Sequence, residues 1–232
     1  NRSFRNEGIS VRHNPEFTML EVYEAYADYY QIMDLTEEMI RYVVREAAGA
    51  LKIKYQEQEI DFESPWARYT MLGAIEKIGK IKVSYEDDIA DLQKVAEKLE
   101  IEVHPAFGKG RIINEIFEKT VEHKLIQPTF ILDYPLELTP LARRHPQNPN
   151  LVERFELIVA GREIANAFSE LTDPLEQRRR FEEQVAQREA GLEEAQMLDE
   201  DFVRALEYGM PPTGGLGIGI DRLVMIITDS YS

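Results

Sequence analysis

The stretch TGGLGIGIDRLVMII, residues 213–227, constrains the fold more than any other, because its periodicity changes at a single point. Its glycines alternate with the apolar residues Leu216, Ile218 and Ile220. This alternation predicts a strand over 214–220, and the glycines predict that a ligand or a helix lies close to the strand backbone. An apolar helix is predicted to follow, with Arg222 in its first turn. An arginine at a helix N-terminus that faces a glycine-lined strand suits a polyphosphate.

The same alternation predicts further strands, and helical periodicity separates them. Alternation predicts a strand at 16–27, a strand or hairpin at 52–62, and a pair of strands over 152–169 that joins at Ala160–Gly161. The apolar run at 128–138, with a proline near each end, predicts a buried strand. The predicted helices are 34–51 with Thr36 as N-cap, 64–79 beginning at Ser64–Pro65, two over 84–125, 174–190 and 199–208. The helices over 84–125 are predicted to form an inserted subdomain with a solvated charged face. A solvent-facing surface is also predicted for the EQRRRFEEQ cluster that begins at Glu176.

Composition limits the classes of protein to consider. The 232 residues suffice for one large domain, and the absence of cysteine excludes disulfides, thiolate zinc sites and cysteine nucleophiles. The net charge of −16 disfavours broad nonspecific binding of nucleic acid but allows a local basic pocket. No apolar run suits a bilayer span and no signal-peptide pattern is present, so a cytoplasmic protein is expected. The first and last residues, NRSFRNEG and VMIITDSYS, predict a fragment.

Basic and acidic side chains are expected to converge on a nucleotide phosphate site. The basic members are Arg5, Arg12, His13 and Arg222, and the acidic members are Glu156 and Glu163 on the paired strands. The planar guanidinium matches phosphate oxygens, and Mg²⁺ prefers oxygen ligands such as carboxylates. These residues indicate nucleotidyl transfer. The sequence has no Walker-A lysine loop, no dinucleotide fingerprint, no metal spacing among its four histidines and no G-x-S-x-G motif.

Separate motifs resemble those of class II aminoacyl-tRNA synthetases. FRNEGISVRHNPEFTMLE resembles motif 2, and GLGIGIDRLVM resembles motif 3. RHNPEFTMLEVY, DYPLELTPLAR and GREIANAFSEL are similar to the lysyl branch of the class rather than to the aspartyl or asparaginyl branch. The resemblance covers the whole chain. It implies an α+β fold in which an antiparallel sheet is flanked by helices, truncated at both ends. Residues 1–232 would form a partial catalytic domain with a helical insertion around 84–125, without motif 1 or the anticodon-binding β-barrel.

The resemblance also implies an activity. The expected reaction is ATP-dependent activation of L-lysine to lysyl-adenylate, followed by transfer of lysine to tRNA(Lys), with Mg²⁺ as cofactor. A homodimer is expected for the full-length protein, in the cytoplasm. Two alternatives stay open: a truncated paralogue that lysylates a protein such as elongation factor P, and a noncatalytic fragment that binds nucleotide.

Site residues follow from the same resemblance. Arg5 and Arg222 are the expected catalytic residues, with Arg5 on the α-phosphate and the lysine carboxylate. The residues expected to bind ATP are Arg5, Glu7, Arg12, His13, Asn14, Phe17, Gly219 and Arg222, with Phe17 stacked on adenine. The residues expected to line the lysine pocket are Glu21, Tyr23, Asn166, Phe168 and Glu170, since an ammonium group needs carboxylates and an aromatic face. Glu156 and Glu163 are expected to bind magnesium.

Overall fold

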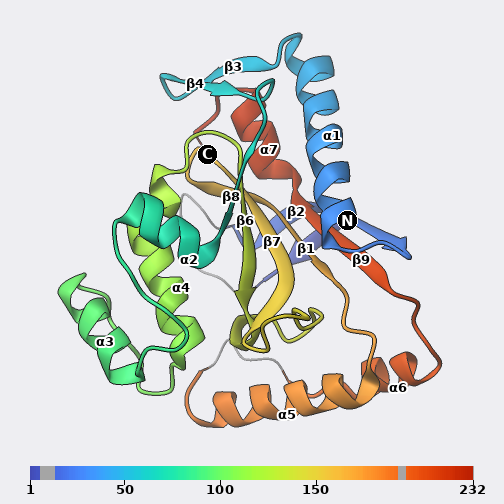
Figure 1. The fold of residues 1–232 in the computed structure, drawn as a ribbon. Coiled ribbons are helices and arrows are strands. Elements are labelled where there is room, and N and C mark those ends of the chain that lie inside the picture. The colour runs from blue at the N-terminus through green and yellow to red at the C-terminus, as the bar shows by residue number, and fades with distance from the viewer. Residues whose placement is uncertain (6–13, 193–196, 232) are drawn as a thin grey trace.

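One large sheet organises the molecule. The computed structural model describes residues 1–5, 14–192 and 197–231 (Figure 1). The sheet has seven strands in the order β1-β2-β9-β8-β7-β6-β5, and every neighbouring pair is antiparallel except β5 and β6. Its strands are β1 (Arg2–Phe4), β2 (Glu16–Ala25), β5 (Ala67–Thr70), β6 (Thr129–Pro135), β7 (Leu151–Val159), β8 (Arg162–Ser169) and β9 (Thr213–Gly219). The predicted α+β class with a mostly antiparallel sheet is confirmed.

Two helices cover one face of this sheet. α1 (Tyr29–Ala48) packs on β7, β8 and β9, and α7 (Ile220–Ile227) packs on β2, β8 and β9 (Figure 1). Apolar side chains of β8 and β9, among them Ala165 and Ile218, are buried in the resulting core. The hairpin of β3 (Lys52–Tyr55) and β4 (Gln58–Asp61) closes this core at one end and joins it through buried Tyr55 and Ile60.

The helical insertion packs on the opposite face, over β6 and β7. The predicted insertion around 84–125 contains α3 (Ile89–Lys98), α4 (Lys109–Thr120) and η2 (Glu122–Lys124), and α2 (Met71–Ala74) and η1 (Ile75–Gly79) precede it on the same face. Ile131 of β6 and Ile158 of β7 are buried against it. Glu137, in the short helix η3 (Leu136–Leu138), accepts hydrogen bonds from the backbone amides of Gly108 (2.8 Å) and Gly110 (3.0 Å), so the beginning of α4 is capped from the sheet.

α5 (Pro174–Glu189) and α6 (Glu200–Glu207) lie across one end of the sheet (Figure 1). The prediction that α5 begins at Asp173–Pro174 is confirmed, because the Asp173 side chain accepts from the amides of Leu175 and Glu176. The prediction that the EQRRRFEEQ cluster faces solvent is wrong for Gln177 and Arg180, which are buried, whereas Arg179 and Glu183 are exposed as predicted. Arg180 is only 2% exposed and donates to the backbone carbonyls of Thr139 and Ala142.

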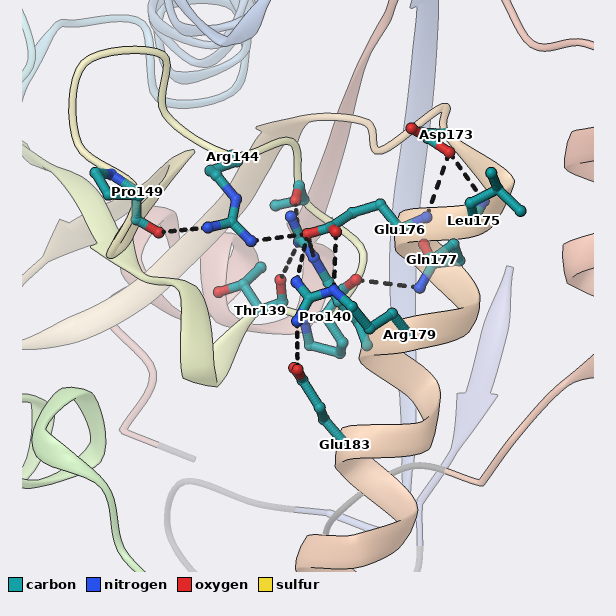
Figure 2. A network of polar contacts seen from close by, with 12 residues as sticks. Thr139, Pro140, Arg144, Pro149, Asp173, Leu175, Glu176, Gln177, Arg179 and Glu183 are labelled. Atoms are coloured by element: carbon teal, nitrogen blue, oxygen red, sulfur yellow. Dashed lines mark hydrogen bonds and ion pairs between the residues drawn. The ribbon is translucent and has the colours of Figure 1, made fainter.

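Figure 2 shows the polar network around Glu176 at the beginning of α5. The Glu176 carboxylate accepts from Arg144 at 2.9 Å, from Arg179 at 2.9 Å and from Arg180 at 3.0 Å. Gln177 reaches the carbonyl of Pro140 at 3.1 Å. α5 is therefore held against the loop 136–150 by charge-assisted hydrogen bonds rather than by an apolar stripe.

Two predicted helix beginnings are wrong. α1 begins at Tyr29, because Asp28 and Gln31 form a capping box, whereas Thr36 is buried inside the helix with its hydroxyl on the carbonyl of Ile32 at 2.7 Å. The segment predicted as the helix 64–79 first forms the edge strand β5, and helix begins only at Met71.

In the part of the chain that the structure describes, we find no helix with the length and hydropathy of a membrane span.

Candidate active site

Strand register brings six of the predicted site residues to one face of the sheet. Residues opposite each other on antiparallel strands project to the same side. Glu156 of β7 lies opposite Asn166 of β8, and Asn166 lies opposite Gly217 of β9. Glu21 of β2 lies on the other side of Gly217. Glu21, Asn166 and Glu156 therefore form one row across four strands.

A second row runs parallel to the first, one step along the strands. It contains Tyr23 of β2, Gly215 of β9, Phe168 of β8 and Arg154 of β7. The two rows hold four of the five residues predicted for the lysine pocket. The centre of each row is a glycine of β9, and a neighbouring side chain occupies the space beside it, Glu170 at Gly215 and Met19 at Gly217.

A β-bulge in β8 brings Glu163 to this face. Glu163 and Asn166 are three residues apart, so strict alternation would place them on opposite faces. Leu157 lies opposite Ala165 while the next residue, Ile158, lies opposite Glu163, which leaves Ile164 as an extra residue. The side chain of Ile164 is buried in the core of the other face.

The glycines of β9 allow neighbouring side chains to pack closely against both faces of the strand. A Cβ atom at Gly215 would collide with the carboxylate of Glu170 and lie 3.2 Å from the Tyr23 ring. A Cβ atom at Gly214 would collide with Ile32 of α1. The prediction that a helix lies close to this backbone is confirmed at Gly214. On the site face, the Glu170 side chain occupies the space beside Gly215.

The end of the site around Gly215 is acidic. Burial raises the pKa of Glu170 to about 7. Burial also raises the pKa of Tyr23, and the negative charges of Glu21 and Glu170 add to this effect. Two carboxyl groups that flank an aromatic hydroxyl are suited to a cation such as an alkylammonium group.

The other end is a pocket of about 500 Å³ lined by Glu156, Glu163 and Arg222. Arg222, in the first turn of α7, donates to the backbone carbonyl of Glu163 at 2.8 Å and to its carboxylate at 3.3 Å. The same turn is tied to β2, because the amide of Thr18 donates to Asp221 at 2.6 Å. The guanidinium is thus held over the sheet with 29% of its side chain exposed.

Glu156 and Glu163 are suited to a divalent cation. Burial raises the pKa of Glu156 to about 7, the charge of Arg154 opposes this, and the charge of Glu163 adds to it. A cation between the two carboxylates would relieve their repulsion, and each oxygen keeps a second lone pair for it. Among the described residues, no group of three or more acidic or histidine side chains could hold a metal, so a Mg²⁺ ion here would complete its shell with phosphate and water.

The helical insertion forms one wall of this pocket. The lining includes five residues of α4, namely Arg111, Asn114, Glu115, Phe117 and Glu118. The charges of the insertion were predicted to form mostly a solvated face without a role in the site, and α4 departs from this because charged residues of this helix line the pocket. Glu118 also adds to the rise in the pKa of Glu156.

The motif 2 residues lie at the edge of the site. The guanidinium carbon of Arg5 lies 5.0 Å from the centroid of the Phe17 ring, and its amide donates to the carbonyl of Pro15 at 3.0 Å. Asn14 is exposed, and its side chain donates to the carbonyl of Glu16. Gly219 is the N-cap residue of α7. Glu7, Arg12 and His13 lie outside the described residues.

Sequence reasoning missed Arg154. Its guanidinium contacts Asn166 and Glu156, which belong to the predicted lysine pocket and metal pair. Period two was a usable signal, since Arg154 lies two residues before Glu156 and so shares its face. The sequence alone does not show that Arg154 lies beside Asn166, because this requires the register between β7 and β8.

Comparison with known proteins agrees with this fold. The family described as tRNA synthetases class II (D, K and N) matches residues 1–232, and the chain belongs to that family. Within it, the chain is similar over its whole length to proteins named lysine–tRNA ligase. Identity is 60% over 231 residues for Moorella thermoacetica, 56% over 234 for Pelotomaculum thermopropionicum and 52% over 231 for Bacillus subtilis. The chain spans about half the length of these relatives, 46–47%.

Proposed function

We propose that this chain is the catalytic part of a lysine–tRNA ligase that activates L-lysine with ATP and transfers it to tRNA(Lys) in the cytoplasm. The observation that carries the proposal is the polarity of the site. An acidic end around Glu170 and Tyr23 lies a few strand positions from the pocket that holds Arg222 and the carboxylates of Glu156 and Glu163. Such a site can hold an amine at one end and a polyphosphate at the other.

In the first step, the lysine side-chain ammonium would lie between Glu21, Tyr23 and Glu170. Its carboxylate would then point along the strands toward Asn166 and the phosphates. One carboxylate oxygen attacks the α-phosphorus of ATP, the bond to the β-phosphate oxygen breaks, and pyrophosphate leaves with the electron pair. Binding both reactants in line supplies most of the catalysis, because the chemistry needs positioning and charge stabilisation.

Two arginines would stabilise the phosphates in this step. Arg5 is assigned to the α-phosphate and the lysine carboxylate, with Phe17 stacked on adenine, and Arg222 to the terminal phosphate. The contact between Arg222 and Glu163 orients the guanidinium before ATP binds. Gly219 and Asn14 are assigned to the nucleotide, together with Glu7, Arg12 and His13 outside the described residues.

Glu156 and Glu163 would hold Mg²⁺, which supplies charge neutralisation and orientation of the phosphate oxygens when bound. In the second step, a ribose hydroxyl of tRNA(Lys) attacks the carbonyl carbon of lysyl-adenylate, and AMP leaves with the electrons of the mixed anhydride bond. We expect the full-length protein to be a homodimer. A paralogue that modifies a protein, or a noncatalytic fragment, is not favoured, since the relatives matched along the whole chain carry the ligase name.

The test is amino-acid-dependent exchange of pyrophosphate into ATP, measured with this chain and with a form extended to the length of its relatives. Exchange with lysine, and none with aspartate or asparagine, is the expected result for the extended form. Absence of exchange with every amino acid, from a folded extended protein, would refute the proposal. Exchange by the 232 residues alone would further show that they form a self-sufficient site.

A further inference from the structure

We infer that Arg154 is a positioning residue that orients Asn166 and Glu156 together, and so couples the lysine pocket to the metal pair. The inference rests on the proposed function. It assigns to one buried guanidinium the task of fixing two side chains that contact different substrates.

The geometry around Arg154 supports this assignment. Its side chain is only 13% exposed, and three acceptors from three elements surround it. Nε donates to Oδ1 of Asn166 at 2.9 Å, and one terminal nitrogen donates to the Thr139 hydroxyl at 2.8 Å. The other terminal nitrogen pairs with the carboxylate of Glu156. The guanidinium carbon lies 4.4 Å from the centroid of the Tyr134 ring, which supports the planar group from one side.

The contact with Asn166 fixes the direction of its amide. A guanidinium carries only donors, so the atom that faces it must be the amide oxygen. The N–H₂ group of Asn166 then lies on the other side of the amide and is directed away from Arg154. Without Arg154, the amide could turn over and present an acceptor to the substrate in place of a donor.

The contact with Glu156 works in the same way on the carboxylate. One oxygen pairs with Arg154, and the other accepts from the Tyr134 hydroxyl at 2.8 Å. Two donors on the two oxygens hold the plane of the carboxylate in one orientation. The guanidinium thus joins two predicted ligands on different strands through a rigid planar group.

Lysine at position 154 would keep the charge but lose the fork. A single ammonium cannot replace three hydrogen bonds that point in three directions in one plane. Arg143→Lys is a matched control, because Arg143 also makes two hydrogen bonds to a glutamate of β7, Glu153, but does not line the pocket.

The experiment compares Arg154→Lys with Arg143→Lys in the full-length protein that carries this chain. The readouts are the dissociation constant for lysine by calorimetry, the KM values for lysine and ATP in pyrophosphate exchange, the Mg²⁺ concentration for half-maximal rate, and the melting temperature. For Arg154→Lys, we expect lysine affinity to fall about tenfold or more, because charge-assisted hydrogen bonds that orient the pocket are lost. The Mg²⁺ requirement should also rise, and the KM for ATP should change less than that for lysine.

A second background separates positioning from stability. If Arg154 acts through Asn166, Arg154→Lys in an Asn166→Ala background should cost lysine affinity less than about twofold. Thr139→Val removes one acceptor of Arg154 and leaves the arginine in place. It should also weaken lysine binding, and it provides a folded variant for the test if Arg154→Lys is unstable. Equal losses in both backgrounds, or a lower melting temperature with unchanged lysine affinity, would overturn the inference. A wild-type protein that neither binds lysine nor exchanges pyrophosphate would instead refute the proposed function, and the inference with it.

Discussion

Glu170 is under opposing requirements for stability and for binding. Its carboxylate fills the space beside Gly215, and burial raises its pKa to about 7 from an ordinary value of 4.5. The folded protein therefore binds this proton more tightly than the unfolded chain does. As pH rises from 4.5 through 7, the ionised buried carboxylate lowers the free energy of unfolding.

Lysine binding should respond to pH in the opposite sense. The ionised form of Glu170 attracts the ammonium group, so lysine affinity should increase as pH rises from about 6 to about 8. Glu170→Gln should remove most of this dependence, weaken lysine binding and raise the urea midpoint at about pH 8. Glu24→Gln, on the same β2 strand as Glu21 but at its exposed end, is the control. An unchanged pH profile in Glu170→Gln would contradict this role.

Arg222 should affect ATP far more than folding. Arg222 donates to the backbone carbonyl and the carboxylate of Glu163, and 29% of its side chain is exposed, so Arg222→Ala should cost about 1 kcal/mol of stability. The KM for ATP in pyrophosphate exchange should rise about tenfold or more, because a guanidinium–phosphate contact is lost. Arg204→Ala, which removes an exposed i,i+3 ion pair with Asp201, is the control. An unchanged KM for ATP would argue against the assignment.

At the scale of elements, periodicity predicted much of the sheet. It failed where contacts with a neighbouring strand determine the local structure. To within one residue, the strands β2, β7, β8 and β9 lie in segments predicted from alternation, and β6 lies in the segment predicted from its apolar run. β5 was missed because Ser64–Pro65 is a helix-start signal, and pairing with β6 overrides it for only four residues. The bulge at Ile164 has no signal in a single sequence, since an apolar residue in an apolar strand fits either register.

The same limit applies to α5. Its residues EQRRRFEEQ are typical of a solvated helix face, and only the loop 136–150 makes Arg180 a buried residue (Figure 2). Burial of an arginine requires acceptors, which that loop supplies through backbone carbonyls far along the chain. Hydropathy patterns do not detect such partners.

Glu176 should be the residue on which the docking of α5 depends. Hydrogen bonds from Arg179, Arg144 and Arg180 lower its pKa to about 2, against a burial effect that raises it. Because the pKa of Glu176 is lower in the folded protein than in the unfolded chain, its ionised form stabilises the protein at pH values above 4.5. That contribution is lost as pH falls from 4.5 to about 2. Glu176→Gln should cost roughly 3 kcal/mol near neutral pH, because Arg180 would remain buried without its anion.

Urea unfolding at neutral and acid pH checks this prediction. The gap between wild type and Glu176→Gln should narrow as pH falls below about 4.5, where the wild-type carboxylate also becomes protonated. Glu183→Gln is the matched control, since among the described residues the ion-pair partner of Glu183 is the half-exposed Arg179 on the surface of the same helix. If the difference in the free energy of unfolding does not change with pH, the effect of the substitution comes from packing and not from the charge of Glu176.

At the scale of the whole molecule, charge bears on the second step of the reaction. The net charge of −16 repels the phosphate backbone of tRNA on average. We therefore predict that the 232 residues alone bind tRNA(Lys) far more weakly than the full-length protein does at about 0.15 M salt. Fluorescence anisotropy with labelled tRNA checks this, with circular dichroism to verify that the isolated chain is folded. Equal affinity of the two forms would show that this part carries the main tRNA contacts.

The sequence predicted individual residues of the candidate site, and only the strand register shows which of them lie side by side. The resemblance pointed to Glu21, Tyr23, Asn166, Phe168 and Glu170, and four of these lie in the two cross-strand rows. Arg154 and the lining contributed by α4 were not predicted, because both depend on which strand and which helix lie beside the pocket.

The position of β9 has a consequence for the order in which the protein is made. Among the described strands, β9 comes last in sequence, yet it lies between β2 and β8. During synthesis the two halves of the sheet emerge long before the strand that joins them, so the edges of β2 and β8 remain unpaired on the nascent chain. Arrival of β9 would close the sheet and assemble both substrate ends at once. A ribosome that stalls before Thr213 would therefore release a chain with two open edges, a natural client for chaperones.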